Sequence, residues 1–238
     1  MTVLHPRGVN HLALSTTDMR AQLRFWCDVL GCPLKALYWM HGVEGCYHGF
    51  VELAPDSYVA FVQHPKNGTE IELGVSHAGS PGGPVTGGTM QHVAFHVDSF
   101  DDLLAMRDRI RSRGLQVWGP IDHGFVQSIY FAGPEGLSLE VATGSDIDDR
   151  AWIDPEVTAL CGISDEELAA LRQPAPFTPA PHPVAQPPFD EAPFHLHPPE
   201  YWRRLMEVPD ELTWERASET TPPVRVTDDG ADPAAGDH

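Results

Sequence analysis

Residues 89–143 read TMQHVAFHVDSFDDLLAMRDRIRSRGLQVWGPIDHGFVQSIYFAGPEGLSLEVAT. Near each end of this stretch, apolar residues alternate with small or polar ones, around His92 and around Glu140. Successive side chains of a β-strand point to opposite faces, so each run predicts a strand with one apolar face. His92 and Glu140 both fall on the other face, among small residues. We therefore expect two strands that present a His and a Glu in a cup on the side away from the hydrophobic core.

The N-terminal region repeats the pattern of this stretch. Residues 9–14 read VNHLAL and align with MQHVAF at 90–95, so His11 holds the position of His92. In both copies a polar helix start follows, and then a helix that ends in glycine. An internal repeat of this kind predicts two similar βαβββ units whose first strands each present a histidine.

The repeat and the hydrophobic periodicity divide residues 1–145 into two such units. The first unit is expected at about 7–64 and the second at 89–143, with a glycine-rich linker at 65–88. For the first unit we expect one strand, a helix and three strands, at 9–16, 18–30, 34–41, 46–53 and 58–63. For the second we expect the same order at 90–97, 99–113, 115–121, 126–132 and 136–142. The fold class is therefore α+β, with two tandem βαβββ units that form a cupped mixed sheet.

Residues 146–238 are expected to form an acidic C-terminal extension. The chain from residue 144 onward holds 15 of the 23 prolines and 20 of the 34 Asp and Glu residues. Short helices are expected at 154–161, 164–172 and 201–208, the second beginning with a capping-box pattern. The last ~20 residues are expected to be disordered on composition. The extension is thus Pro-rich and partly helical, and one hypothesis is that it covers the cup.

Charge and hydropathy exclude several classes of partner. The net charge of −19 argues against binding to nucleic acid or anionic membranes, because phosphate recognition needs a basic face. No apolar run approaches the ~18 residues of a membrane span, and the N-terminus lacks a signal-peptide layout. The four cysteines have no CxxC spacing, which is typical of reduced thiols in a cytoplasmic protein. The sequence leaves a homo-oligomer open.

Two histidines and a glutamate on strand faces of small residues are typical of a metal site. His11, His92 and Glu140 match the facial triad of two His and one carboxylate, which leaves positions open on a non-haem Fe(II). Taken singly, a strand histidine is more often a hydrogen-bonded core residue, and a strand glutamate is often solvated. The repeated context of the two histidines favours the metal-ligand interpretation.

The duplicated units and the run IDHGFVQSIYFAGPEGLSLE at 121–140 resemble the vicinal oxygen chelate superfamily. This superfamily includes glyoxalase I, the bleomycin and fosfomycin resistance proteins and the extradiol dioxygenases. The run is most similar to the signature of type I extradiol ring-cleaving dioxygenases, from which it departs at Gly133, where the family usually has Asp or a similar polar residue. Residues 128–143 are similar to the hydroquinone-cleaving branch, which often carries Arg where His123 stands.

The resemblance implies a role for each matching residue. His11, His92 and Glu140 would bind the metal, Tyr130 would hydrogen-bond the substrate oxygen, and His123 would act as an acid or base. The implied cofactor is Fe(II), with Mn(II), Zn(II) or Ni(II) as alternatives. The implied partners are dioxygen and a small dihydroxylated aromatic, either a catechol or a hydroquinone, which places the protein in aromatic compound catabolism.

One departure from the resemblance bears on the reaction. Glyoxalase I-like members carry a fourth ligand, usually Glu, on the last strand of the first unit, and residues 58–63, YVAFVQ, contain no carboxylate. Gln63, at the end of that strand, is expected to face solvent. Three ligands favour an oxygenase over an isomerase. Whether His41, His48 or His96 line the site is left open.

Three functions remain in competition on this scaffold. The first is an Fe(II)-dependent extradiol-type ring-cleaving dioxygenase, which the signature around Tyr130 favours. The second is a metal-dependent, glyoxalase-like lyase, isomerase or epimerase, which would act without dioxygen. The third is a metal-free binding or resistance protein that sequesters a small molecule in the cup.

Overall fold

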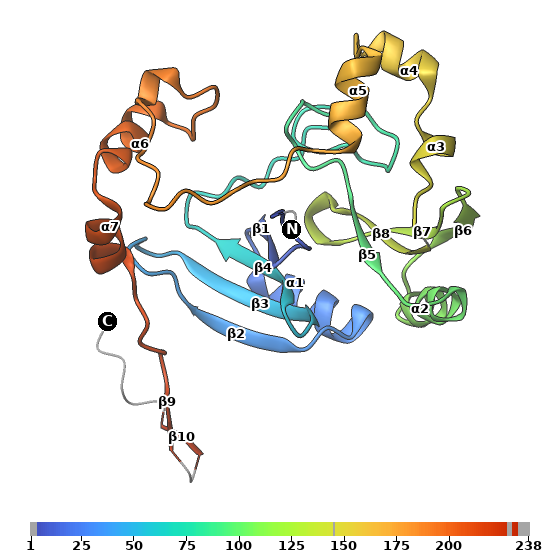
Figure 1. Ribbon diagram of the computed structural model, residues 1–238. Coiled ribbons are helices and arrows are strands. Elements are labelled where there is room, and N and C mark those ends of the chain that lie inside the picture. The colour runs from blue at the N-terminus through green and yellow to red at the C-terminus, as the bar shows by residue number, and fades with distance from the viewer. Residues whose placement is uncertain (1–3, 145, 228–229, 233–238) are drawn as a thin grey trace. The chain divides into compact units, whose positions relative to one another are not determined.

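The computed structural model describes residues 4–144, 146–227 and 230–232 (Figure 1). Contacts divide the chain into a larger compact unit, His5–Pro174, and a smaller one made mainly of the residues that follow. The larger unit contains two modules, each with its own four-stranded mixed sheet. The two tandem βαβββ units are thereby confirmed, and each forms a four-stranded mixed sheet of its own.

The first module runs from β1 to β4. Its elements are β1 His11–Thr16, α1 Met19–Arg24, the π-helical continuation η1 Phe25–Leu30, β2 Leu34–Trp39, β3 Tyr47–Ala54 and β4 Ser57–Gln63. The strand order is β1-β4-β3-β2, in which β1 is parallel to β4 and the other neighbours are antiparallel. The sheet therefore leaves β1 at one edge and β2 at the other.

Local chemistry fixes both ends of the first helix. The Asp18 side chain accepts a hydrogen bond from the Ala21 N–H at 2.9 Å, which satisfies a donor that the helix itself leaves unpaired. At the other end, Gly31 adopts φ +87°, a left-handed conformation that ends the helix. Gln63 Oε1 accepts a hydrogen bond from the Met19 N–H at 2.8 Å. The residue that we expected to face solvent is thus engaged at the helix start.

The second module repeats this plan after a long connection. Its elements are β5 Val93–His96, α2 Phe100–Ser112, β6 Trp118–Asp122, β7 Val126–Ala132, the short 3₁₀ turn η2 Pro134–Gly136 and β8 Ser138–Gly144. The strand order is β5-β8-β7-β6, with β5 parallel to β8. The strand predicted from residue 90 begins only at Val93, so His92 lies directly before it.

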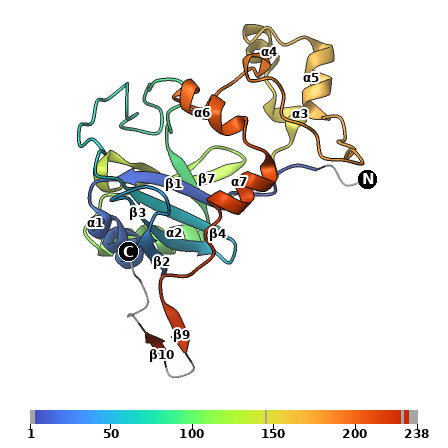
Figure 2. The same cartoon turned by 90° about the vertical axis from the view of Figure 1, so that its left-hand side faces the viewer.

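The alternation of side chains separates a core face from an open face in each sheet. On the second sheet Leu139 and Val141 are buried in the core, while Glu140 and Ala142 point to the other side and line a pocket. The helix α2 packs on β7 and β8 and also contacts η1 of the first module (Figures 1 and 2). The core cluster draws on both modules: Leu14, Met19, Phe25, Trp26, Val29, Leu30, Val51, Val59, Phe61, Leu103, Ile110, Val117, Ile129, Phe131, Leu139 and Val141.

Trp26 joins the two modules through the core. Its indole is fully buried and lies 5.7 Å from the Phe61 ring and 5.2 Å, edge-on, from the Phe95 ring. Aromatic pairs at these separations stabilise a core beyond the apolar area that they bury. Truncation of such a side chain to alanine typically lowers the free energy of unfolding by about 3–5 kcal/mol.

A partly buried carboxylate, that of Glu135, forms a second connection between the modules. Glu135, in the turn between β7 and β8, accepts hydrogen bonds from the Thr16 hydroxyl (2.6 Å), from the Thr17 N–H and hydroxyl (2.7 Å each) and from the Gln22 amide (2.7 Å). Burial works to raise the pKa of the Glu135 carboxyl, but these four hydrogen bonds outweigh it and hold the pKa below its ordinary value. The residue has φ +54°, which a non-glycine side chain adopts only where its surroundings hold it.

The extension begins inside the larger unit. Its first helices are α3 Asp149–Trp152, α4 Pro155–Leu160 and α5 Asp165–Arg172, of which α4 and α5 were predicted and α3 was not. The Ser164 hydroxyl accepts a hydrogen bond from the Glu167 N–H at 3.2 Å, as its capping-box pattern indicates. The last strand, β8, ends at Gly144, whereas the larger compact unit extends to Pro174.

Over its described residues, the smaller unit contains short elements. They are η3 Phe189–Glu191, α6 Pro199–Met206, α7 Asp210–Ala217, β9 Arg225–Thr227 and β10 Gly230–Asp232, the last two paired as an antiparallel hairpin (Figure 2). The prediction of disorder for the last ~20 residues falls partly on 228–229 and 233–238, which lie outside the described residues. Among the helices that the structure describes, none has the length and apolar character needed to cross a membrane.

Candidate functional site

His92 and Glu140 form the polar centre of the second sheet's open face. His92 Nε2 lies 3.0 Å from Glu140 Oε2, and Glu140 is only 5% exposed. The parallel register of β5 and β8 sets Ala94 beside Glu140, so small side chains leave room around the carboxylate. A carboxylate this buried needs an opposite charge, a donor or a metal ion nearby. The arrangement therefore presents one imidazole nitrogen and one carboxylate oxygen at a common point.

The orientation of His92 is set by its neighbour in the chain. The Gln91 side-chain oxygen is hydrogen-bonded to His92 Nδ1, which leaves Nε2 to face Glu140. Histidines that bind metals are commonly oriented by a partner on the other ring nitrogen. An imidazole nitrogen and a carboxylate oxygen are both common metal donors, and here the two atoms lie in contact with each other. The sequence had singled out His92 but not Gln91, although the repeat contained the signal for it.

Tyr130 and His123 form a second polar pair beside the first. Tyr130 lies directly opposite Glu140 in the β7–β8 register, and its hydroxyl is 3.0 Å from His123 Nε2. Burial raises the pKa of Tyr130, and the negative charge of Glu140 adds to this effect. Tyr130 therefore keeps its proton at neutral pH and remains available as a hydrogen-bond donor.

A pocket of about 750 Å³ covers these four residues. His92, His123, Tyr130 and Glu140 line its polar part. The remaining lining residues are apolar or small for the most part: Ala94, Phe95, His96, Phe125, Val126, Ala142, Thr143, Gly144, Ile147 and Trp152. Concave sites with a few convergent polar groups on an apolar wall are typical of small-molecule binding. Phe125, Ile147 and Trp152 were not predicted to belong to the site.

His11 holds the matching position on the first sheet. Its Nδ1 is hydrogen-bonded to the Asn10 side-chain oxygen at 2.9 Å, as the Nδ1 of His92 is to Gln91. Its ring lies 5.9 Å from that of Phe50. The structure thus brings together four of the five predicted site residues and leaves His11 on the sheet of the other module. Over the described part of the chain, no three His, Cys, Asp or Glu side chains form a group that could hold a metal.

The edges that carry the two histidines nevertheless flank a common space. Residues of β1 and the segment just before β5, including Ala13, Ser15, Met90 and Gln91, line one cavity of about 400 Å³. Each of these strands is the outermost of its sheet. His11 and His92 themselves are not among the residues that line this cavity.

The three other histidines considered from the sequence lie in two different places. His96 lines the pocket of the second sheet, where its Nε2 lies 3.8 Å from Asp98 Oδ1. His41 and His48 lie on the first module, their rings 6.1 Å and 5.8 Å from the ring of Tyr38. Only His96 thus lines the pocket that contains His92 and Glu140.

A family model matches residues 8–141, which are more than half of the chain, and its description is Glyoxalase/Bleomycin resistance protein/Dioxygenase superfamily. The chain belongs to this superfamily. The match begins just before β1 and ends within β8, so it covers both modules and every predicted site residue. The superfamily predicted from the His-centred repeat and the 121–140 run is confirmed.

Among curated proteins, the superfamily chain is similar to biphenyl-2,3-diol 1,2-dioxygenase 2 of Rhodococcus globerulus. The two are 29% identical over 131 residues, which are 55% of this chain and 60% of the relative. The chain therefore matches less than two thirds of that enzyme's length. The name of this relative states its own substrate, biphenyl-2,3-diol.

Solved structures of the superfamily resemble the chain more remotely. A glyoxylase/bleomycin resistance protein/dioxygenase domain from Frankia sp. EAN1pec has 18% identity and a TM-score of 0.48, covering 59% of this chain and all of that one. The fosfomycin resistance protein FosX from Listeria monocytogenes, complexed with Mn(II) and sulfate, has 16% identity and a TM-score of 0.42. That match covers 62% of this chain and 99% of FosX.

Proposed function

We propose that this chain is a metal-dependent, extradiol-type dioxygenase that cleaves the ring of a dihydroxylated aromatic. The observation that carries the proposal is the 3.0 Å approach of His92 Nε2 to Glu140 Oε2 in a pocket that also contains the Tyr130–His123 pair. A metal-binding edge beside an acid–base pair is the combination that oxygen-dependent ring cleavage requires. The distant likeness to a biphenyl-2,3-diol dioxygenase supports the same reaction class.

The proposed ligands are His92, Glu140 and His11. The Gln91–His92 and Asn10–His11 pairs share one hydrogen-bonding pattern on Nδ1, so Nε2 is the ring nitrogen that would bind the metal in each module. The Nε2 of His92 lies 3.0 Å from Glu140 Oε2, an oxygen of the second proposed ligand. We assign Fe(II) as the metal, with Mn(II), Zn(II) or Ni(II) as alternatives, because two His and one carboxylate suit non-haem Fe(II). When bound, such a metal acts as a Lewis acid on a substrate hydroxyl and provides open positions for the diol and dioxygen.

The residues around the metal position have distinct tasks. The protonated Tyr130 hydroxyl donates a hydrogen bond to a substrate oxygen and so orients the diol. His123 exchanges a proton with the Tyr130 hydroxyl, or takes one from the substrate, because its Nε2 lies within hydrogen-bond distance of that hydroxyl. The apolar remainder of the pocket binds the ring and excludes water. This assignment places the protein in aromatic compound catabolism.

The experiment that tests the proposal is anaerobic reconstitution. The full chain is loaded with Fe(II) and mixed with a panel of catechols and hydroquinones, and dioxygen is then admitted. We expect stoichiometric oxygen uptake and a coloured ring-opened product, both lost in His92→Ala and retained in His182→Ala. His182 is an exposed histidine outside the pocket, so it controls for the number of histidines available to bind metal adventitiously.

Two other outcomes would redirect the assignment. Metal binding without oxygen uptake, together with conversion of a substrate in the absence of dioxygen, would replace the dioxygenase by a lyase, isomerase or epimerase. Binding of an aromatic with no dependence on metal and no turnover would replace both enzymes by a small-molecule binding protein. Measurement of bound metal by atomic absorption in wild type, His11→Ala and His92→Ala separates these cases.

A further inference from the structure

The first helix of the C-terminal extension supplies a side chain to the pocket. Trp152, at the end of α3, and Ile147, just before it, line the same cavity as His92 and Glu140. Both lie beyond residue 141, where the match to the superfamily model ends. Part of the apolar lining of the pocket therefore comes from a segment that lies outside the superfamily match.

Trp152 is seated on the turn that carries His123. Its indole packs edge-on against the Phe125 ring at 4.7 Å, and Gly124 lies directly beneath it. A Cβ atom at Gly124 would come within 2.6 Å of Trp152 Cζ2, and Gly124 has φ +93°. The close approach of the indole thus requires glycine at this position. Trp152 is nevertheless 51% exposed, so one part of the ring is packed and the rest is open to a ligand.

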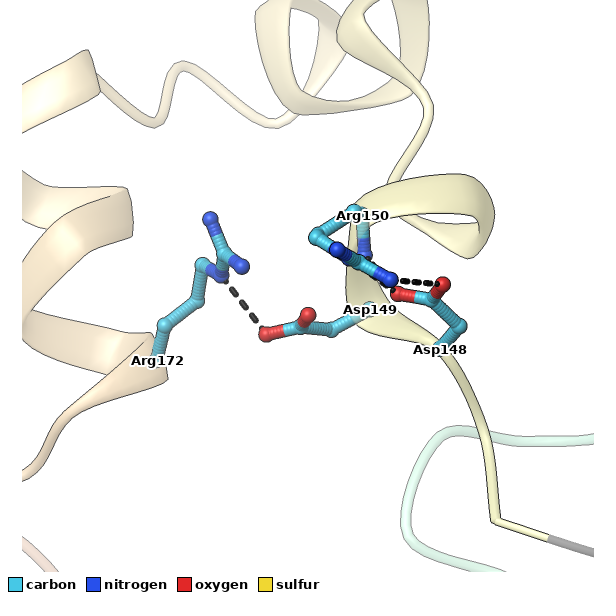
Figure 3. A network of polar contacts seen from close by, with 4 residues as sticks. All are labelled: Asp148, Asp149, Arg150 and Arg172. Carbon is cyan, nitrogen blue, oxygen red and sulfur yellow. Dashed lines mark hydrogen bonds and ion pairs between the residues drawn. The ribbon is translucent and has the colours of Figure 1, made fainter.

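The polar contacts of α3 cap its first turn and join it to α5 (Figure 3). The Asp148 carboxylate accepts a hydrogen bond from the Arg150 N–H at 3.1 Å and pairs with the Arg150 guanidinium at 2.7 Å. Asp149 accepts a hydrogen bond from Arg172 Nε of α5 at 2.8 Å. The helix that presents Trp152 is therefore attached to α5 as well as to the β6–β7 turn.

The pocket lining combines two kinds of side chain. His92, His123, Tyr130 and Glu140 are polar, whereas Phe125, Ile147 and Trp152 are large and apolar. None of the described residues that line the pocket is a lysine or an arginine. A carboxylate substituent on the ring would therefore find neither of these cations in the lining. An apolar substituent would cover the exposed part of the indole and be removed from water.

We propose that Trp152, backed by Phe125, is the specificity-determining wall of the pocket and selects diols that carry an apolar substituent or a second ring. The proposal rests on the proposed function, because that function orients the hydroxyls toward His92 and Glu140. The pocket volume of about 750 Å³ lies within the ~300–1,000 Å³ of sites that bind drug-sized ligands, so it has room for more than a single ring.

The test compares two probes that differ in one apolar group. Dissociation constants of catechol and 4-tert-butylcatechol are measured by calorimetry on the Fe(II)-loaded full chain without dioxygen. We expect Trp152→Ala to lower the preference for 4-tert-butylcatechol, expressed as the ratio of the two constants, by about tenfold, since the apolar group then loses its contact area. Trp152→Phe is expected to restore part of that preference. Trp214→Ala, at a 77% exposed tryptophan of the smaller unit, is expected to leave it unchanged.

Failure of the wall and failure of the proposed function give different results. An unchanged ratio in Trp152→Ala, in protein whose melting temperature matches the wild type, would overturn the wall. If catechol binds no better with Fe(II) than without it, the proposed function fails. In that case 4-tert-butylphenol and phenol are compared on the metal-free chain. If the metal-free chain prefers the tert-butyl compound and Trp152→Ala loses this preference, the proposed role of Trp152 stands. If Trp152→Ala keeps the preference, that role is overturned.

Discussion

The two modules have the same strand order, but their open faces carry different chemistry. In the first sheet Ala13 is paired with Ala60, and at the matching place in the second sheet Ala94 is paired with Glu140. The position that holds a nearly buried carboxylate in one module thus holds a methyl group in the other. The comparison shows that a duplicated β-framework tolerates either residue at this point, because the side chain there lies on the face away from the shared core.

The next strand continues the contrast. Phe50 lies opposite Ala60 in the first sheet, whereas Tyr130 lies opposite Glu140 in the second. Beside Phe50 is His48, whose ring nitrogens are buried with no partner among the described residues. Burial, with His11 contributing, lowers the pKa of His48, which favours its neutral form. The first face therefore carries aromatic rings and histidines at the places where the second carries Tyr130 and Glu140.

The largest expected effect comes from removing Glu140, the carboxylate that the second face has where the first has Ala60. We expect Glu140→Ala to lower metal affinity by more than about 100-fold, beyond the usual effect of changing a residue that only orients a ligand. Isothermal calorimetry with Fe(II) or Mn(II) measures it. The matched control is Glu52→Ala, a sheet carboxylate of the first module that pairs with Lys35 at 3.1 Å. Equal metal affinity in the two variants would remove Glu140 from the site.

The phenol hydroxyl is the second difference between the faces. Tyr130→Phe gives the second module the side chain that the first has at this position, and we expect kcat/KM to fall by about 100-fold through loss of the proton donor. The control Tyr47→Phe changes a first-module tyrosine that packs against Trp39. Steady-state oxygen uptake on the best substrate of the panel reports both values. An unchanged rate in Tyr130→Phe would exclude the proposed hydrogen bond to the substrate.

The turn between the last two strands also differs between the modules. Glu135 of the second module binds the end of β1, whereas Asp56 occupies the same turn in the first. In Glu135→Gln one carboxylate oxygen becomes an NH2 group, which would oppose an N–H of either Thr17 or Gln22. We expect the free energy of unfolding to fall by about 2 kcal/mol. For Asp56→Asn the expected change lies within about 0.5 kcal/mol. Urea unfolding followed by tryptophan fluorescence compares the two, and equal losses would contradict the role of Glu135 as a connection between modules.

The same carboxylate makes a small contribution to the pH dependence of stability. Its pKa in the folded protein lies below the ordinary value of 4.5, so the stabilisation is complete above that value. It is lost as the pH falls through the lower, folded-state pKa, because the proton then displaces the hydrogen bonds. We expect the difference in unfolding free energy between wild type and Glu135→Gln to shrink between about pH 7 and pH 3. A constant difference would show that Glu135 acts without its charge.

Much of this architecture can be predicted from the periodic spacing of apolar residues, which reflects local structure over a few residues. The alternation around Glu140 predicts its face, and the glycine after the first helix predicts the helix end, because both depend on local backbone geometry. The strand before α2 was predicted too long: β5 begins at Val93, whose register partner is Leu139, close to the start of β8. The two separate sheets were not predicted, since alternation within a strand says nothing about pairing between modules.

Contacts across long stretches of chain lay beyond the sequence pattern. The hydrogen bond between Glu135 and Thr16 joins residues that are 119 positions apart, and no short-range rule specifies it. The contact between Trp152 and Gly124 depends on the path of the chain after β8. The role of His11 as a third metal ligand stays a prediction, which the metal-binding comparison of His11→Ala with His92→Ala tests.

The alternation in β8 has a consequence for how such a protein can be changed. Leu139 and Val141 pack in the core and stabilise the fold, while the alternate residues Glu140 and Ala142 face the pocket. A substitution at the second pair alters what the pocket contacts without creating a void in the core. Along this strand, therefore, mutations that change the chemistry of the pocket and mutations that change the stability of the fold fall on alternate residues. For directed evolution of substrate range, saturation of Ala94 and Ala142 is the library that this geometry recommends.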